Sequence, residues 1–205
     1  MKKKLLLPLL LAGGLCSTPA FAETYVSGSV GLGMLGNVDS KDTVTGETTK
    51  DAMEFKSGVP FGVAFGYKFD EYRAEAAIGY QSHDADKWKD GAGVLHPMTG
   101  SASVLSFMAN GYRDFVIKDS GVSPYVTAGF GLAKIKGEGE DGESTADKSV
   151  FAWQLGAGVG IKASDKVVVD LGYRYFKPSK IKSNDGSDES TLSISNFLAG
   201  VRYTF

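Results

Sequence analysis

The sequence predicts an all-β protein, an eight-stranded antiparallel transmembrane β-barrel of the up-and-down type. Three observations predict it. About eight segments alternate large apolar residues with small or polar ones, which is the period of two of a strand. Each segment is near the ~9–11 residues that cross a bilayer at a tilt, and long polar connections alternate with mostly shorter ones. The last segment, residues 195–205, needs partners along both edges, and a closed barrel provides them by pairing it with the first strand.

Residues 1–22 have the pattern of a secretory signal peptide: three lysines after the initiator, a short apolar run and the ending Ala-Phe-Ala. The run is too short to span a bilayer as a helix, which needs ~20 residues. A lipoprotein signal needs a small residue before its cysteine, and Leu15 stands before Cys16, the only cysteine. We therefore expect cleavage after Ala22 and a barrel domain over residues 23–205, in which no disulfide is available.

The charge balance and the glycine content limit the classes of function and fold that this chain can have. The chain has 22 basic and 24 acidic side chains, and removal of the signal would take away lysines only. A negative balance argues against nucleic acid as a partner, because nucleic acid calls for a basic face. The 27 glycines, interspersed with aromatic residues, fit many short strands better than helices.

The first three strands illustrate the pattern. Residues 24–34 place Val, Leu and Met on one face and Ser and Gly on the other, and the polar stretch 36–57 then reads as a long exposed loop. In residues 58–69 every large apolar side chain falls on one face and Gly, Ala, Pro and Lys fall on the other. Asp70-Glu71 is a tight turn, and residues 72–81 return as the second arm of a hairpin.

Five further strands follow with the same alternation. We place them at residues 100–112, 124–132, 151–161, 167–176 and 195–205, with connections at 83–98, 114–123, 137–143, 164–165 and 178–190. In the strand at 100–112 the faces are harder to assign, and we favour Ser106 and Asn110 on the inner one.

Side-chain size indicates which face lies outside. In a soluble barrel the water-facing positions would carry Lys, Glu and Thr, whereas glycine there would only weaken the strands. A membrane barrel of ~8 strands needs small residues in its narrow interior. We therefore expect the aromatic side chains to face lipid: Phe61, Phe65, Phe69, Phe107, Phe130, Phe151, Trp153, Tyr173, Phe197 and Tyr203.

The inner face then carries a small set of polar and charged side chains. We expect them to form a carboxylate–guanidinium network in a filled lumen, because a charge buried without a partner is costly. The expected members are Arg73, Glu75, Gln81, Asn110, Gln154, Asp170, Arg174 and Arg202.

Four stretches resemble one family: residues 123–131 (SPYVTAGFG), 156–160 (GAGVG), 169–175 (VDLGYRY) and 199–205 (AGVRYTF). They are similar to the small outer-membrane β-barrel proteins of Gram-negative bacteria, the opacity-type and surface-antigen porins and the barrel domains of outer-membrane proteins A and X. The resemblance implies the outer membrane as location, Sec export, periplasmic chaperones as partners, and Phe205 as the signal read by the barrel-assembly machinery.

Few residues suggest a catalytic, metal-binding or ligand-binding role. His83 and His96 fall in the predicted connection 83–98, and Ser82-His83-Asp84 invites comparison with a hydrolase triad, but consecutive residues point to opposite sides and a triad needs geometry. The acidic stretch 138–147 lacks the spacing of a calcium loop and reads as solvated. Three lysines near an outer strand end are candidates to touch lipopolysaccharide phosphates: Lys177, Lys180 and Lys182.

We therefore expect a monomer with both termini on the periplasmic side, four polar loops outside, and contacts with outer-membrane lipid and lipopolysaccharide. The expected role is structural or at the surface, namely membrane integrity, adhesion or antigen display through the loops, without an open pore, catalytic residue, metal or cofactor. Two alternatives remain: a small-solute porin and an outer-membrane lipid-acting hydrolase.

Overall fold

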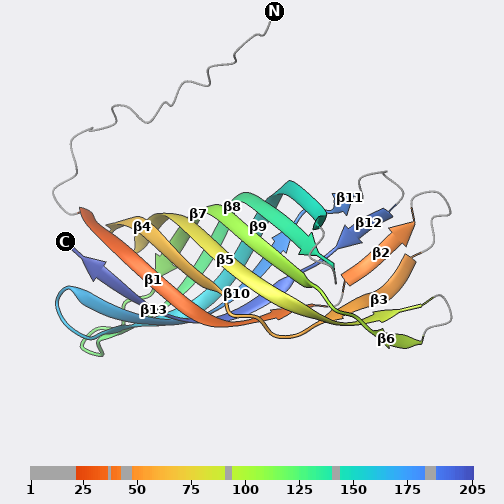
Figure 1. The fold of residues 1–205 in the computed structure, drawn as a ribbon. Coiled ribbons are helices and arrows are strands. Elements are labelled where there is room, and N and C mark those ends of the chain that lie inside the picture. Colours follow the sequence, from red (N-terminus) through yellow and green to blue (C-terminus); the bar gives the residue numbers. More distant parts are fainter. Residues whose placement is uncertain (1–21, 37, 43–47, 91–93, 140–143, 183–187) are drawn as a thin grey trace, which may run out of the picture.

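The computed structural model describes residues 22–36, 38–42, 48–90, 94–139, 144–182 and 188–205 (Figure 1). The signal-peptide prediction lies almost entirely outside these residues. Among them, no helix is long and apolar enough to cross a membrane.

Eight strands, each antiparallel to its neighbours, form a closed barrel, so the predicted fold class is confirmed. Strand β13 pairs with β1 from Tyr25 opposite Thr204 to Leu35 opposite Ile194, and this closes the circuit. The barrel strands in order are β1 (Ala22–Leu35), β4 (Phe61–Phe69), β5 (Tyr72–Lys89), β7 (Ser101–Asp114), β8 (Val122–Glu138), β9 (Ser144–Lys162), β10 (Val167–Pro178) and β13 (Ile194–Thr204).

The first residues of β1 and the end of β13 lie at one end of the barrel, which we call the terminal end (Figure 1). Short turns join the strands there, and in one of them Asp70 takes a positive φ of 53°, a conformation that aspartate tolerates better than most residues. The opposite end, which we call the distal end, carries the longer connections.

At the distal end the structure differs from the sequence prediction. Much of residues 36–57, 83–98 and 178–190 is not irregular loop but strand: β2 (Val38–Asp42), β3 (Thr48–Phe55), β6 (Leu95–Pro97), β11 (Ile181–Lys182) and β12 (Asp188–Thr191). Strand β5 continues beyond the barrel to Lys89 and pairs with β3 and β6. The result is a sheet in the order β11-β12-β2-β3-β5-β6, which we call the crown (Figure 1). The alternation of apolar and polar residues does not indicate these strands, because a strand whose two faces are both in water needs no apolar face.

The outer surface of the barrel is apolar. Along β4 the exposed and less exposed residues alternate, with Phe61, Val63, Phe65 and Phe69 outward. The aromatic side chains that the sequence analysis assigned to lipid are all exposed on this surface, from Phe130 at 61% to Trp153 at 38%. Neighbouring rings touch, as Tyr173 and Phe197 do with centroids 5.2 Å apart. A soluble barrel with a greasy interior would bury these rings, so the structure contradicts that alternative.

Candidate functional site

The interior of the barrel is polar toward the terminal end and apolar toward the distal end. Three charged or hydrogen-bonded groups occupy the polar part, and we take this part, together with the crown, as the candidate site. The polar part contains all the predicted interior polar residues except Gln81, which lies nearer the distal end.

The first group is a buried ion pair between β5 and β7. Arg73 donates from Nη2 to Asp114 Oδ1 at 2.8 Å and from Nε to Asp114 Oδ2 at 2.9 Å, and both side chains are at most 5% exposed. The Arg73 guanidinium also lies 4.1 Å from the centroid of the Tyr112 ring and 5.0 Å from that of Tyr125. Asp114 is not among the predicted interior residues, because the sequence pattern predicts a connection from residue 114, whereas β7 continues to Asp114.

The second group is an ion pair between β10 and β13. Arg202 Nη2 donates to Asp170 Oδ1 at 3.2 Å, and the guanidinium lies 5.5 Å from the centroid of the Tyr25 ring. Phenol rings therefore cover both of the buried arginines that have carboxylate partners. Such contacts add cation–π attraction to the ion pairs.

The third group is centred on Glu75, which the structure does not pair with an arginine within the described residues. Its carboxylate accepts hydrogen bonds from Tyr25 Oη at 3.2 Å, Tyr112 Oη at 2.9 Å and Asn110 Nδ2 at 3.2 Å. Gln154 Nε2 donates in turn to Asn110 Oδ1. Glu75 therefore belongs to a network of phenols and amides, which also provides hydrogen bonds to this half-buried carboxylate.

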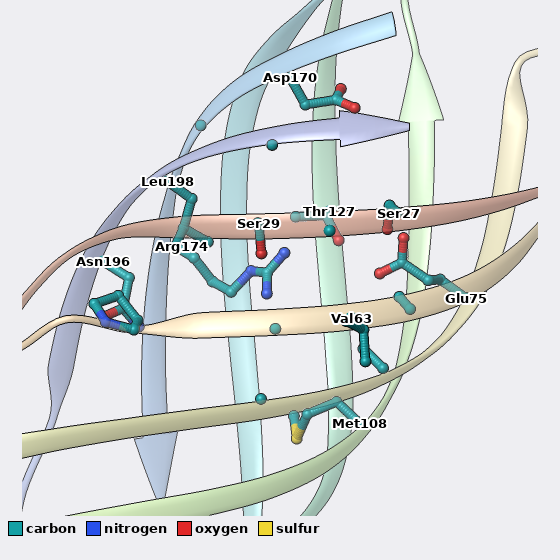
Figure 2. Close-up of a pocket in the computed structure, with 18 of the residues that line it drawn as sticks. Ser27, Ser29, Val63, Glu75, Met108, Thr127, Asp170, Arg174, Asn196 and Leu198 are labelled. Carbon is teal, nitrogen blue, oxygen red and sulfur yellow. The ribbon is translucent and has the colours of Figure 1, made fainter. Parts of the chain in front are cut away.

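Arg174 is linked to this group at a longer distance. Its Nη2 donates to Tyr112 Oη at 3.4 Å. Figure 2 shows the Arg174 and Glu75 side chains projecting into the barrel interior, where both line a cavity of about 110 Å³. Gln81 and Asn196 also line it, and their amide oxygens have no partner among the described residues. Toward the distal end its lining includes buried apolar side chains, Met108 and Phe176 among them.

We call those apolar side chains the plug. Its members are buried and come from barrel strands and the approach to β13: Leu35, Val104, Met108, Ala133, Ile135, Ala152, Phe176, Leu192 and Ile194. Phe55, Val150 and Ile181 pack against them from the distal side. The sequence predicts a lumen of small residues with a few charges, whereas the distal half of the lumen holds a buried apolar cluster like the core of a soluble protein.

Glycines make room for the interior phenols. A side chain at Gly66 would collide with the ring of Tyr25, its cross-strand neighbour. A side chain at Gly158 or Gly172 would collide with the hydroxyl end of Tyr125. Alternation places small residues on the inner face, but it does not indicate that some of them accommodate the rings of Tyr25 and Tyr125.

His83 lies on β5, not in a loop as predicted, and it is 1% exposed. Beyond Tyr80 the outward face of β5 becomes polar, so His83 lies on the distal side of the lipid-facing band. Its Nδ1 is 3.3 Å from Lys56 O, and burial lowers the pKa of the imidazole. Ser82 and Asp84 lie on the opposite face of the strand, so these three residues do not assemble a triad.

His96 lies in the crown. Its ring stacks on Trp88 with centroids 5.1 Å apart, and its Nε2 lies 2.8 Å from Asp90 Oδ2. Of the acidic stretch 138–147, residues 140–143 lie outside the described residues. Within the described part of the chain, no group of three or more His, Cys, Asp or Glu side chains is placed to hold a metal ion.

The family model of the outer membrane protein beta-barrel domain matches residues 9–205. The chain belongs to this family. It is 25% identical to outer membrane protein PagN of Salmonella typhimurium over 98% of this chain and 97% of that protein. It is 29% identical to the virulence membrane protein PagC of the same organism, over 86% and 85% of the two chains.

Solved structures show the same fold. Neisserial surface protein A superimposes with a TM-score of 0.59 at 19% identity, over 89% of this chain and 97% of that one. OprG of Pseudomonas aeruginosa superimposes with a TM-score of 0.57 at 13% identity, over 90% and 96%. The protein is thus an integral barrel of the outer membrane, the location that the resemblance implied. Membership of this family fits the expected structural or surface role.

Proposed function

We propose that the protein acts at the bacterial surface, as a closed barrel that holds the crown outside the cell for adhesion or antigen display. The observation that carries this proposal is that β5 continues from the membrane into the crown as one strand. A hydrogen-bonded sheet holds its exposed side chains in fixed positions, whereas an irregular loop must order them when it binds.

The crown carries exposed apolar side chains beyond the lipid-facing band. Met53, Trp88, Val94 and Leu95 are each at least 36% exposed, and Met53 lies opposite Trp88 across β3 and β5. Met53 and Trp88 lie together on one face of the crown, and adjacent exposed apolar side chains outside a membrane suit an interaction site. The Asp90–His96 contact and the stacked His96 ring hold Trp88 in place, which suits a rigid aromatic anchor.

The interior supports a role without transport. The ion pairs fill the terminal half of the lumen and the plug fills the distal half, so a solute would have to displace packed side chains. We infer that the barrel does not conduct. The name of PagC, a virulence membrane protein, fits a role in contact with a host.

We also propose the biogenesis that the sequence implies. The chain is exported through Sec, cleaved after Ala22, carried by periplasmic chaperones and inserted by the barrel-assembly machinery, which reads Phe205. It then stays a monomer with both termini in the periplasm. Intact-mass measurement of the protein from outer membranes tests the cleavage site, and a Phe205→Ser variant tests the assembly signal.

The function is tested with a crown variant in intact cells. We expect Trp88→Ser combined with Leu95→Ser to reduce attachment of expressing bacteria to host cells, or binding of surface-directed antibodies, at least fivefold. The matched control is Trp153→Ser, on the lipid-facing surface. Equal attachment by the crown variant and the wild type, at equal surface amounts, would refute recognition through the crown.

The two alternatives have their own measurements. A large, steady single-channel conductance of the pure protein in a planar bilayer would establish a porin. Loss of an activity on outer-membrane lipid in His83→Ala would establish a hydrolase. We expect neither, because the plug closes the lumen and His83 is buried away from Ser82 and Asp84.

A further inference from the structure

The sequence of the distal end is acidic, whereas that of the rest of the barrel is balanced. The distal connections and the strand ends that carry them hold 16 acidic and 11 basic side chains, counted over residues 36–57, 81–103, 134–149 and 177–193. The other residues from Glu23 onward hold 8 acidic and 8 basic side chains. The whole negative excess of the barrel domain therefore belongs to the end that carries the crown.

Carboxylates also share the face of the crown that carries Trp88. From residue 86 to residue 90, β5 alternates, with Asp86 and Asp90 on the face of Trp88 and Lys87 on the other face. Glu54 of β3 lies directly opposite Lys87 across the strand pair, so this lysine has a carboxylate as its neighbour on that other face. The cation and the two carboxylates are therefore separated by the sheet.

The two carboxylates differ in their contacts. Asp86 is half-buried and forms no ion pair with any residue that the structure describes. One oxygen of Asp90 lies 2.8 Å from His96 Nε2, and the other accepts a hydrogen bond from the backbone N–H of Val94 at 2.8 Å. The indole ring of Trp88 attracts cations as well, through its π face. This face of the crown thus combines an apolar anchor with groups that favour a positive charge.

We infer that the partner of the crown is a basic polypeptide segment that carries apolar side chains. An apolar side chain of the partner packs on Met53 and Trp88, and an arginine or lysine beside it reaches Asp86. The negative excess of the distal end attracts the segment over a longer range and repels polyanions. The inference rests on the proposed function, because it names the chemistry of the partner that the crown recognises.

Binding of synthetic peptides to the purified protein tests the inference. The protein is held in nanodiscs of phosphatidylcholine, which has no net charge, and binding of labelled peptides is followed by fluorescence anisotropy. The basic peptide consists of Lys, Arg and Leu, and the charge-reversed peptide has Glu in place of every Lys and Arg. We expect the basic peptide to bind at least about tenfold more tightly, and the difference to shrink as salt is added.

Two variants locate the binding site on the crown. Trp88→Ser and Asp86→Lys should each weaken binding of the basic peptide about tenfold, the first by removing the anchor and the second by placing like charges together. The matched controls make the same changes elsewhere: Trp153→Ser on the lipid-facing surface and Asp165→Lys in an exposed turn of the terminal end. Both controls should bind the peptide as the wild type does. Heat-shifted gel mobility shows that every variant is folded.

Four results would overturn the inference: equal binding of the two peptides, tighter binding of dextran sulfate than of the basic peptide, unchanged binding in both crown variants, or pairing of two copies of the chain in place of peptide binding. The outcomes are separable from those of the proposed function. Equal binding of the two peptides, with attachment of cells still lost in the crown variant, would overturn the basic partner and leave recognition through the crown intact.

Discussion

Removing the carboxylate of Asp114 should destabilise the barrel more than any change on its surface. The Asp114→Ala variant would leave the Arg73 guanidinium, 3% exposed, without the acceptor of its bonds at 2.8 and 2.9 Å. Breaking a buried pair on one side costs about 3–5 kcal/mol, because an uncompensated charge remains. The nearby Tyr112 ring keeps part of the electrostatic attraction, so we expect the lower half of that range.

Urea unfolding in phospholipid vesicles, followed by tryptophan fluorescence, measures this free energy. The double variant Arg73→Met with Asp114→Leu should recover to within about 1 kcal/mol of the wild type, since apolar replacement of a buried pair is often neutral. Asp165→Ala, which removes the solvent-exposed partner of Lys162, should have no measurable effect. A loss below about 1 kcal/mol for Asp114→Ala, or no recovery in the double variant, would refute the reasoning.

Three further predictions follow from the interior. Gly158→Ala should cost about 1–3 kcal/mol of unfolding free energy, because the new methyl collides with Tyr125 and the backbone of β10, whereas Gly28→Ala, where nothing lies within 4 Å, should be nearly neutral. Phe176→Ala should cost about 3–5 kcal/mol by opening a cavity in the plug, and a loss under about 1 kcal/mol would mean that the plug is loosely packed. His83 has a lowered pKa in the folded state, so the unfolded state takes up a proton first as the pH falls below about 6.5, and stability should decline there until the folded-state pKa is passed. The His83→Gln variant should lack this component of a pH series of unfolding curves; an identical pH dependence in both proteins would count against it.

The sequence by itself determined the barrel, the inside and outside of its strands, and its membrane. Alternation along residues 58–69 and the Asp70-Glu71 turn depend only on residues that are neighbours in the chain. Features of this kind can be recognised from one sequence without knowledge of the fold. The aromatic residues could be assigned to the outer surface because the interior of a narrow barrel has room for many side chains only if most of them are small.

Only the tertiary structure decided which interior groups meet. Arg73 and Asp114 are 41 residues apart, and their contact depends on the register of β5 against β7, which no periodicity encodes. The same holds for Glu75, which lies among phenols and amides instead of guanidinium groups. His83 was assigned to a loop because β5 loses its apolar outward face where it leaves the lipid. Hydrogen bonds to β3 and β6 continue that strand into the crown, and backbone pairing of this kind leaves no mark on side-chain pattern.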